Sequence, residues 1–261
     1  MRSLSIAATG MLAQQTNVEV ISNNIANMNT TGYTRRRAEF NDLLYQNLRR
    51  GGATSSDAGT IVPAGVQVGL GVKTVAVYRI TEAGSMVNTD NTLDLAVQGK
   101  GYFQIQLPTG DYAYTRDGSF QMSPSGQIVT HEGYPVQPGI TIPPNAVGVS
   151  INNSGQVLIK LDGTVAQSSV GQLQLAVFPN EAGLEAVGDN LLKETPASGA
   201  ATLNTPGQPG YGTVLQGFLE TSNVNPVTEV TNLVSAQRAY EMNSKVIQAA
   251  NEMMQTVVQT K

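Results

Sequence analysis

The chain has no cysteine and no tryptophan, and it is poor in aromatic and charged residues. Without cysteine there is no disulfide bond, no thiolate metal site and no cysteine nucleophile. Only 5% of the 261 residues are aromatic and only 13% are charged, against roughly 25% charged in a typical soluble protein. Because neutral polar side chains can be buried against another copy at lower desolvation cost than charged ones, this composition suits a protein whose surface is largely interface. A polar, β-rich secreted protein would have a similar composition.

Long apolar runs are also missing. No segment of about 20 apolar residues could span a bilayer. Polar residues interrupt the first 24 residues, where a cleavable signal peptide would need an unbroken apolar stretch. The interruptions are Thr9, Gln14, Gln15, Thr16 and Asn17. We therefore expect a protein that does not span a membrane and keeps its encoded N-terminus, either in the cytoplasm or after export by a route that reads no cleaved signal.

Basic charge is scarce as well. The net charge of −4 and the pI near 5.0 argue against nucleic acid as the partner, because phosphate binding needs a concentrated basic face. One basic cluster, Arg35–Arg37 with Arg49 and Arg50 further on, is diluted by Glu39 and Asp42. A solvated or inter-subunit salt-bridging role fits this cluster best.

Residues that could support catalysis or hold a metal ion are sparse. His131 is the single histidine, and no serine lies in a GxSxG turn. One histidine beside Glu132 is too little for a transition-metal site. Residues 65–74 superficially resemble a phosphate-binding loop, but Val72 separates the last glycine from Lys73 and a strand is expected to follow. We therefore expect no catalytic, metal or cofactor site, with glycan hydrolysis by distant paired carboxylates as the alternative.

Both ends of the chain carry the pattern of helices with a seven-residue repeat. The repeat consists of Leu4, Met11, Val18 and Ile25 near the N-terminus, and of Leu233, Tyr240, Ile247 and Met254 near the C-terminus. This spacing places a narrow seam along one side of a helix and is typical of a coiled coil. Gly32 is expected to stop the first helix, and Asn225 as N-cap with Pro226 at the first helical position to start the second. An ordinary amphipathic core helix is the alternative for either segment taken singly.

Polar residues weaken both seams. Gln14, Asn17, Ser22 and Asn243 lie on or beside them, and such residues lower stability but can fix register. Two thin stripes closed across about 200 intervening residues should be marginal in an isolated monomer. We therefore expect the ends of a monomer to be mobile and neighbouring copies to supply the missing burial.

Glycine and serine dominate the chain between residues 49 and 71, which predicts an extended connector or a loose hairpin. Positive φ values or close backbone approach between subunits are expected at its glycines. The candidates are Gly51, Gly52, Gly65, Gly69 and Gly71.

Alternating and β-branched runs then predict strands, including a hairpin formed by residues 102–107 and 112–116 around a turn at residues 108–111. The predicted class is α+β, with an inserted mainly-β domain and paired terminal helices. Its parts are a helical coiled-coil domain (residues 1–30 and 224–261), a connector (31–72) and a β-rich outer domain (73–223).

Residues 22–33, SNNIANMNTTGY, resemble the N-terminal signature of flagellar basal-body rod and hook axial proteins, in which an Asn-rich helix end precedes Thr-Gly-aromatic. The matching residues are Asn23, Asn24, Asn27, Thr31, Gly32 and Tyr33. Residues 35–71 resemble distal rod subunits in particular, and the similarity resumes at residues 93–105, 113–120 and 219–253. Tyr33 and Thr34 replace the Phe and Lys more common at this turn, and residues 140–210 carry little that is diagnostic.

This resemblance implies that the terminal helices of many subunits form the inner wall of a hollow helical tube, with the β-rich domain projecting outward. It also implies export through the flagellar type III apparatus and periplasmic assembly between proximal rod and hook subunits. The distal rod would then turn inside ring bushing proteins as a drive shaft for flagellum-dependent motility. The alternatives are another rod or hook subunit, a secreted module that attaches to the cell wall, and a glycan-cleaving enzyme.

Overall fold

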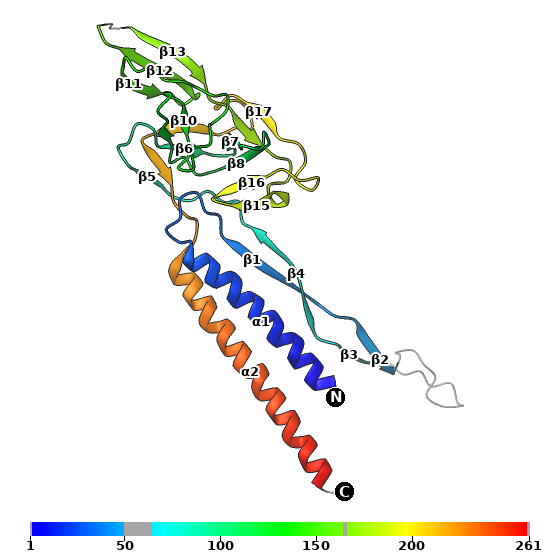
Figure 1. The fold of residues 1–261 in the computed structure, drawn as a ribbon. Helices are drawn as coiled ribbons and strands as arrows, with labels where there is room; N and C mark the ends of the chain where they lie inside the picture. Colours follow the sequence, from blue (N-terminus) through cyan, green and yellow to red (C-terminus); the bar gives the residue numbers. More distant parts are fainter. Residues whose placement is uncertain (1, 50–63, 164–165, 260–261) are drawn as a thin grey trace. The chain divides into compact units, whose positions relative to one another are not determined.

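The computed structural model describes residues 2–49, 64–163 and 166–259 (Figure 1). These residues form two compact units. The helical unit comprises Met1–Ala26, Arg36–Tyr78 and Asn225–Lys261, and the β-rich unit comprises Asn27–Arg35 and Arg79–Val224. The predicted α+β class, with a helix at each end of the chain and strands between them, is confirmed.

Two antiparallel helices, α1 (Arg2–Ala26) and α2 (Pro226–Gln259), lie side by side in the helical unit (Figure 1). The predicted N-cap of α2 is confirmed, because Oδ1 of Asn225 accepts hydrogen bonds from the backbone N–H groups of Val227 and Thr228 at 3.1 and 3.3 Å. Pro226 occupies the first helical position, where a missing N–H leaves no bond unmade. Local sequence signals therefore fix the start of α2.

Small residues let α1 and α2 approach closely. Ala7, Ala236 and Ala250 are buried, and a Cβ atom on Gly10 would lie 2.9 Å from the side-chain amide nitrogen of Asn243. Asn24 bonds to Glu229 at the other end of the contact, which defines an antiparallel register. With 25 residues in α1 and 34 in α2, this register leaves about two turns of α2 beyond the start of α1 (Figure 1).

A two-stranded ribbon completes the helical unit. Its paired strands are β1 (Arg36–Asp42) with β4 (Val72–Arg79), and β2 (Tyr45–Arg49) with β3 (Val66–Gly69). The ribbon contacts α1, since the N–H of Val72 donates to Oγ1 of Thr9 at 3.4 Å and Gly71, with φ +118°, backs onto the same threonine. The boundary expected between the connector and the β-rich domain, at residue 72, lies between β1 and most of β4, which pair with each other. Both strand pairs of the ribbon belong to the same compact unit as the helices.

The β-rich unit is built on a six-stranded sheet and a three-stranded antiparallel sheet. The six-stranded sheet has the order β15 (Glu185–Gly188), β16 (Leu191–Lys193), β8 (Tyr112–Thr115), β7 (Tyr102–Gln106), β14 (Leu175–Val177), β17 (Thr202–Asn204). The three-stranded sheet contains β11 (Ala146–Ile151), β12 (Gln156–Leu161) and β13 (Gln167–Gln172). Strand pairs join β6 (Leu95–Gln98) to β18 (Thr213–Gln216), β5 (Met86–Asn88) to β19 (Phe218–Glu220), and β9 (Gln121–Met122) to β10 (Ile128–Val129). A 3₁₀ helix, η1 (Glu181–Gly183), precedes β15.

The predicted hairpin is confirmed as β7 and β8, with Gln106 opposite Tyr112 at the turn. Apolar and polar or aromatic residues alternate along β7, and its residues are buried on both faces of the strand. Phe103 and Ile105 belong to the main core, while Tyr102 on the other face packs against Phe178. Burial and the neighbouring Glu181 carboxylate raise the pKa of the Tyr102 phenol, which stays protonated and donates to Oε2 of Glu181 at 2.9 Å.

Candidate assembly surfaces

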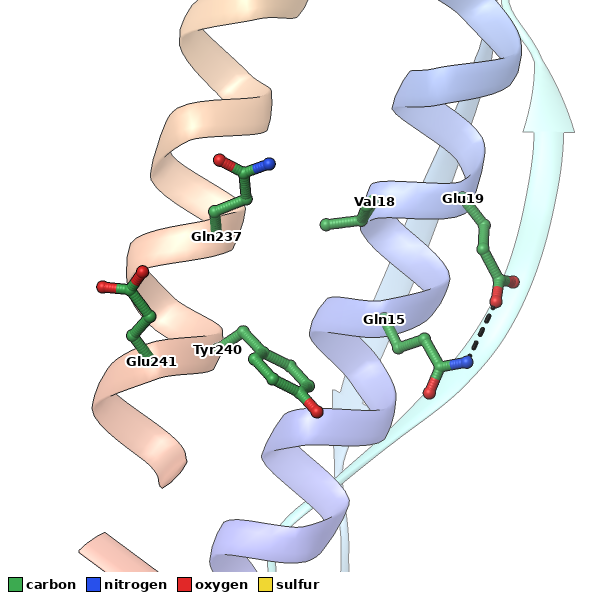
Figure 2. Close-up of a pocket in the computed structure, with 6 residues that line it drawn as sticks. All are labelled: Gln15, Val18, Glu19, Gln237, Tyr240 and Glu241. Carbon is green, nitrogen blue, oxygen red and sulfur yellow. Dashed lines mark hydrogen bonds between the residues drawn. The ribbon is translucent and has the colours of Figure 1, made fainter. Parts of the chain in front are cut away.

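A groove of about 360 Å³ runs along one side of the helix pair (Figure 2). Its lining residues are Gln15, Val18, Glu19, Gln237, Tyr240 and Glu241. Val18 points from α1 toward α2 and Tyr240 from α2 toward α1, while the side chains of Glu19 and Glu241 point away from the facing helix (Figure 2). Nε2 of Gln15 donates to Oε1 of Glu19 at 3.1 Å. The groove is therefore open, and Val18 and Tyr240 supply the apolar part of its lining.

The eight residues predicted to pack between subunits lie on or beside the facing sides of the two helices. Half-buried in the single chain are Leu4, Met11, Val18, Ile25, Leu233, Ile247 and Met254, and Tyr240 is exposed. Fully buried instead are smaller or neighbouring residues such as Ala7, Ile21 and Ala236. Since the alanines bring the helices close, the larger seam side chains lie at the edges of the contact. Their packing between copies stays a prediction.

Asn24 acts as a clamp within the helical unit. It is only 2% exposed, and its Oδ1 accepts the backbone N–H of Arg36 at 2.8 Å while Nδ2 donates to the carbonyl of the same residue at 2.8 Å. Nδ2 also lies 3.2 Å from Oε2 of the buried Glu229. One buried amide therefore joins the end of α1, the start of β1 and the first turns of α2. The sequence marks Asn24 as a motif residue but does not indicate these partners.

Gly32, the next-to-last residue of the family motif, has a backbone conformation that favours glycine. Its φ is +66°, and its N–H donates to the carbonyl of Glu220 at 2.8 Å. A Cβ atom at this position would lie 2.8 Å from the backbone nitrogen of Asp117 and 2.9 Å from the carbonyl carbon of Arg116. Any side chain would therefore strain the backbone and collide with the neighbouring chain.

The other motif residues have more local roles. The carbonyl of Thr31 accepts Nδ2 of Asn190 at 3.2 Å, and Oδ1 of Asn27 accepts the Thr30 hydroxyl at 3.1 Å. Asn23 is exposed on the last turns of α1, and the N–H of Tyr33 donates to the carbonyl of Thr30 at 3.3 Å. The motif thus shapes the turn that follows α1.

Replacing Gly32 with alanine should lower the free energy of unfolding by about 2 to 4 kcal/mol, because left-handed strain and a backbone collision act together. Gly110→Ala is the matched control. Gly110 also has a positive φ, +89°, but a Cβ atom there would meet nothing within 4 Å, so only the strain of about 1 to 2 kcal/mol applies. Urea unfolding of the full chain measures both, and equal losses would contradict the close approach at Gly32.

Asn223 fastens three segments of the β-rich unit. Its Oδ1 accepts the N–H of Arg35 at 2.6 Å, and its Nδ2 donates to the carbonyls of Ile80 and Glu82 at 2.9 and 2.8 Å. Its own N–H donates to the carbonyl of Tyr33 at 3.3 Å. Three of the four stretches by which the chain enters or leaves the β-rich unit, those near residues 35, 79 and 224, are therefore tied to this one residue.

Arg116 and Glu220 form a buried ion pair, with Nε 2.7 Å from Oε2 and side-chain exposures of 10% and 3%. The guanidinium also donates to the carbonyls of Val97, Gly99 and Gly101. The second carboxylate oxygen accepts the N–H of Gly84 at 2.9 Å. Each ion thus has several hydrogen-bond partners besides the other. They lie in the segments 113–120 and 219–253, which carry the family resemblance without revealing that the two side chains meet.

The expected connector is only partly within the described residues, and Gly51 and Gly52 lie outside them. Of the three candidate glycines that are described, Gly65, Gly69 and Gly71, only Gly71 has a positive φ. Gly65 is exposed just before β3, and a Cβ atom on Gly69 would lie 3.4 Å from the ring of Tyr45. The expectation of close approach between subunits at these glycines stays a prediction.

Candidate chemical sites give little within the described ranges. His131 is exposed, and its Nδ1 lies 3.1 Å from Nε2 of Gln121. No group of three or more His, Cys, Asp or Glu side chains able to hold a metal ion occurs among the residues that the structure places. Over the same residues, neither helix combines the length and apolar character needed to cross a membrane.

Three family profiles match successive parts of the chain. They are "Flagella basal body rod protein" at residues 4–34, "Flagellar hook protein FlgE/F/G D1 domain" at residues 96–159 and "Flagellar basal body rod FlgEFG protein C-terminal" at residues 215–260. The flagellar basal-body rod protein FlgG of Caulobacter vibrioides is 62% identical over 99% of both chains. Its counterparts are 52% identical in Agrobacterium fabrum, over 98% of both chains, and 45% identical in Borreliella burgdorferi, over 97% of this chain and 96% of the relative.

The chain therefore belongs to the family of flagellar hook and basal-body rod proteins. Within this family it is a structural subunit of the rod, located in the flagellar basal body.

Proposed function

We propose that the chain is a subunit of the distal rod and polymerises through its terminal helices into a hollow tubular drive shaft. The observation that carries this proposal is the helix pair, which brings both ends of the chain together yet leaves its seam half-open. The similarity to rod proteins along nearly the whole chain supports the distal rod as the place of assembly.

The open seam supplies apolar surface for contacts between copies. Seven seam side chains are half-buried and Tyr240 is exposed, while Leu12, Met253 and Val258 on the same two helices are exposed. Full burial of one such side chain contributes about 1.5 to 3 kcal/mol relative to full exposure. Packing of the two helices against neighbouring copies as a coiled coil would complete this burial in each subunit.

The β1–β4 ribbon offers a second surface of this kind. Leu44, Leu48, Val75 and Val77 are all exposed on it. We infer that the ribbon contributes to contacts between subunits through these side chains, of which Leu44 and Leu48 belong to the predicted connector (residues 31–72) and Val75 and Val77 to β4. The glycines that flank them allow the ribbon to approach other backbone closely.

The further partners that we propose follow from family membership. They are proximal rod and hook subunits at the two ends of the polymer, the surrounding ring bushing proteins and the flagellar type III export apparatus. The proximal rod and hook subunits would pack their own helices against the same seam. The chain would then need no separate binding site for them.

Assembly of the purified full chain tests this proposal. With rising protein concentration, sedimentation should show a critical concentration above which polymer forms, and electron microscopy should show tubes of uniform diameter with a central channel. A chain that stays monomeric at every concentration, or that forms only closed rings, would contradict the proposed polymer.

A further inference from the structure

The charge of the chain is divided unevenly between its two units. The β-rich unit, Asn27–Arg35 with Arg79–Val224, contains twelve acidic and six basic residues, a formal charge of −6. The remaining segments contain seven acidic and nine basic residues, a formal charge of +2. The β-rich unit is therefore more acidic than the whole chain, whose net charge is −4.

Most basic side chains of the β-rich unit bond to groups of the same unit. These are Arg35, Arg79, Arg116 and Lys193, whose partners include the carboxylates of Glu82, Glu220 and Asp111 and the carbonyl of Leu184. Among the described residues of this unit, Lys100 and Lys160 are the two exposed basic ones, whereas eight of the twelve acidic residues are exposed. The surplus of negative charge therefore lies at the surface.

The sizes of the two units bring the β-rich units of neighbouring copies close together. An α-helix with its side chains is about 10 to 12 Å across, so the pair of α1 and α2 is only about 20 Å wide. A compact unit of about 150 residues has a radius of gyration of about 15 Å, which corresponds to a diameter of about 40 Å. The chain passes directly from one unit to the other, as between Arg35 and Arg36. Copies that pack helix against helix therefore bring their wider β-rich units near one another.

We propose that repulsion between the acidic β-rich units opposes polymerisation, so that ionic strength controls the protein concentration at which the polymer forms. This inference rests on the proposed function, because it concerns the assembly of that polymer. Two charges of −6 that are about 40 Å apart in water repel each other with about six times the thermal energy before screening. The Debye length falls from about 30 Å in 0.01 M salt to about 8 Å in 0.15 M salt, so added salt removes most of this repulsion.

Sedimentation of the full chain in 0.01 M and in 0.15 M sodium chloride tests the proposal. The critical concentration for assembly should fall at least about fivefold at the higher salt concentration, because screening weakens the repulsion between copies. Salt also affects apolar contacts, so the same measurement is needed on variants that change only the charge of the β-rich unit.

The first variant replaces four exposed carboxylates with amides, which changes the charge of the β-rich unit from −6 to −2. Its substitutions are Asp90→Asn, Glu132→Gln, Glu185→Gln and Asp189→Asn. Asp90 and Asp189 have positive φ values, which asparagine also adopts readily. Because repulsion scales with the product of the two charges, it falls about ninefold. In 0.01 M salt this variant should assemble at a critical concentration near that of the wild type in 0.15 M salt, with little further response to salt.

Two more variants complete the test. Lys100→Glu with Lys160→Glu raises the charge to −10 and should increase the critical concentration in 0.01 M salt at least about tenfold. The matched control, Asp111→Asn with Lys193→Gln, removes an exposed ion pair and keeps the charge at −6, so its assembly should follow the wild type at both salt concentrations. Urea unfolding checks that the β-rich unit stays folded in each variant.

A critical concentration that does not depend on salt would overturn this inference. An amide variant that keeps the salt response of the wild type would overturn it as well, because the response would then come from groups outside the acidic surface of the β-rich unit. A wild-type chain that assembles at neither salt concentration would instead refute the proposed polymer, and with it this control of its growth.

Discussion

Replacing Arg116 with glutamine should lower the free energy of unfolding of the β-rich unit by about 3 to 5 kcal/mol. The reason is the carboxylate that remains. Glu220 is buried, with 3% exposure of its side chain, and loses the cation 2.7 Å away. Three carbonyls, those of Val97, Gly99 and Gly101, also lose a charged donor. Chemical unfolding of the full chain, followed by near-ultraviolet circular dichroism of its tyrosines, measures the loss.

Two further variants distinguish the effect of leaving the buried Glu220 carboxylate without a cation from the effect of removing any ion pair. Lys193→Gln removes the cation that lies 2.8 Å from Asp111, but these side chains are 44% and 55% exposed, so the expected loss is below about 1 kcal/mol. Adding Glu220→Gln to Arg116→Gln removes the uncompensated charge and should restore part of the stability. If Arg116→Gln and Lys193→Gln destabilise the protein equally, the buried pair has no special role.

Replacing Ile247 with aspartate should abolish assembly, raising the critical concentration more than about 100-fold, because every copy would place an unpaired carboxylate in the helix seam. Ile247 is half-buried in the row of α2 that faces α1. It lies in the helical unit, so the unfolding of the β-rich unit should stay unchanged. Sedimentation gives the assembly, and thermal melting followed through the tyrosines gives the stability of the β-rich unit.

The control for this prediction is Ser235→Asp, which adds the same charge at an exposed position of α2 away from the seam. It should assemble close to normally. Regular polymers of Ile247→Asp would show that the seam faces solvent in the assembly. Unfolding of the β-rich unit would instead show that α2 belongs to a single core with the strands.

Local signals were sufficient to predict several elements. The N-cap at Asn225, the proline that follows it and the hairpin of β7 and β8 each depend on a few consecutive residues. The seven-residue repeats indicated which sides of α1 and α2 face each other, but not that alanines would carry the closest contact. Packing of α1 on the ribbon, through Thr9 and Gly71, was invisible in the repeat because it depends on a segment far along the chain.

The long-range polar contacts of Asn24, Asn223 and Arg116 could not be predicted for a similar reason. The partners Asn24 and Glu229 are 205 residues apart, and Arg116 and Glu220 are 104 residues apart. A single sequence records which residue types are present at such positions but not which of them meet. The family motif drew attention to Asn24 and Gly32, whereas Asn223 and the buried ion pair had no distinguishing local pattern.

The tie at Asn223 has an evolutionary consequence. The chain enters the β-rich unit near residues 80–82 and leaves it near Asn223, whose side chain bonds to Ile80 and Glu82. Next to these residues, β5 pairs with β19. The two ends of the chain segment between β5 and β19 therefore stay at the same distance, whatever strands that segment contains. Descendants of this chain can therefore gain, lose or exchange strands between β5 and β19 without moving the ends of that segment apart, so the sequence inside it is free to diverge faster than the sequence that holds its ends.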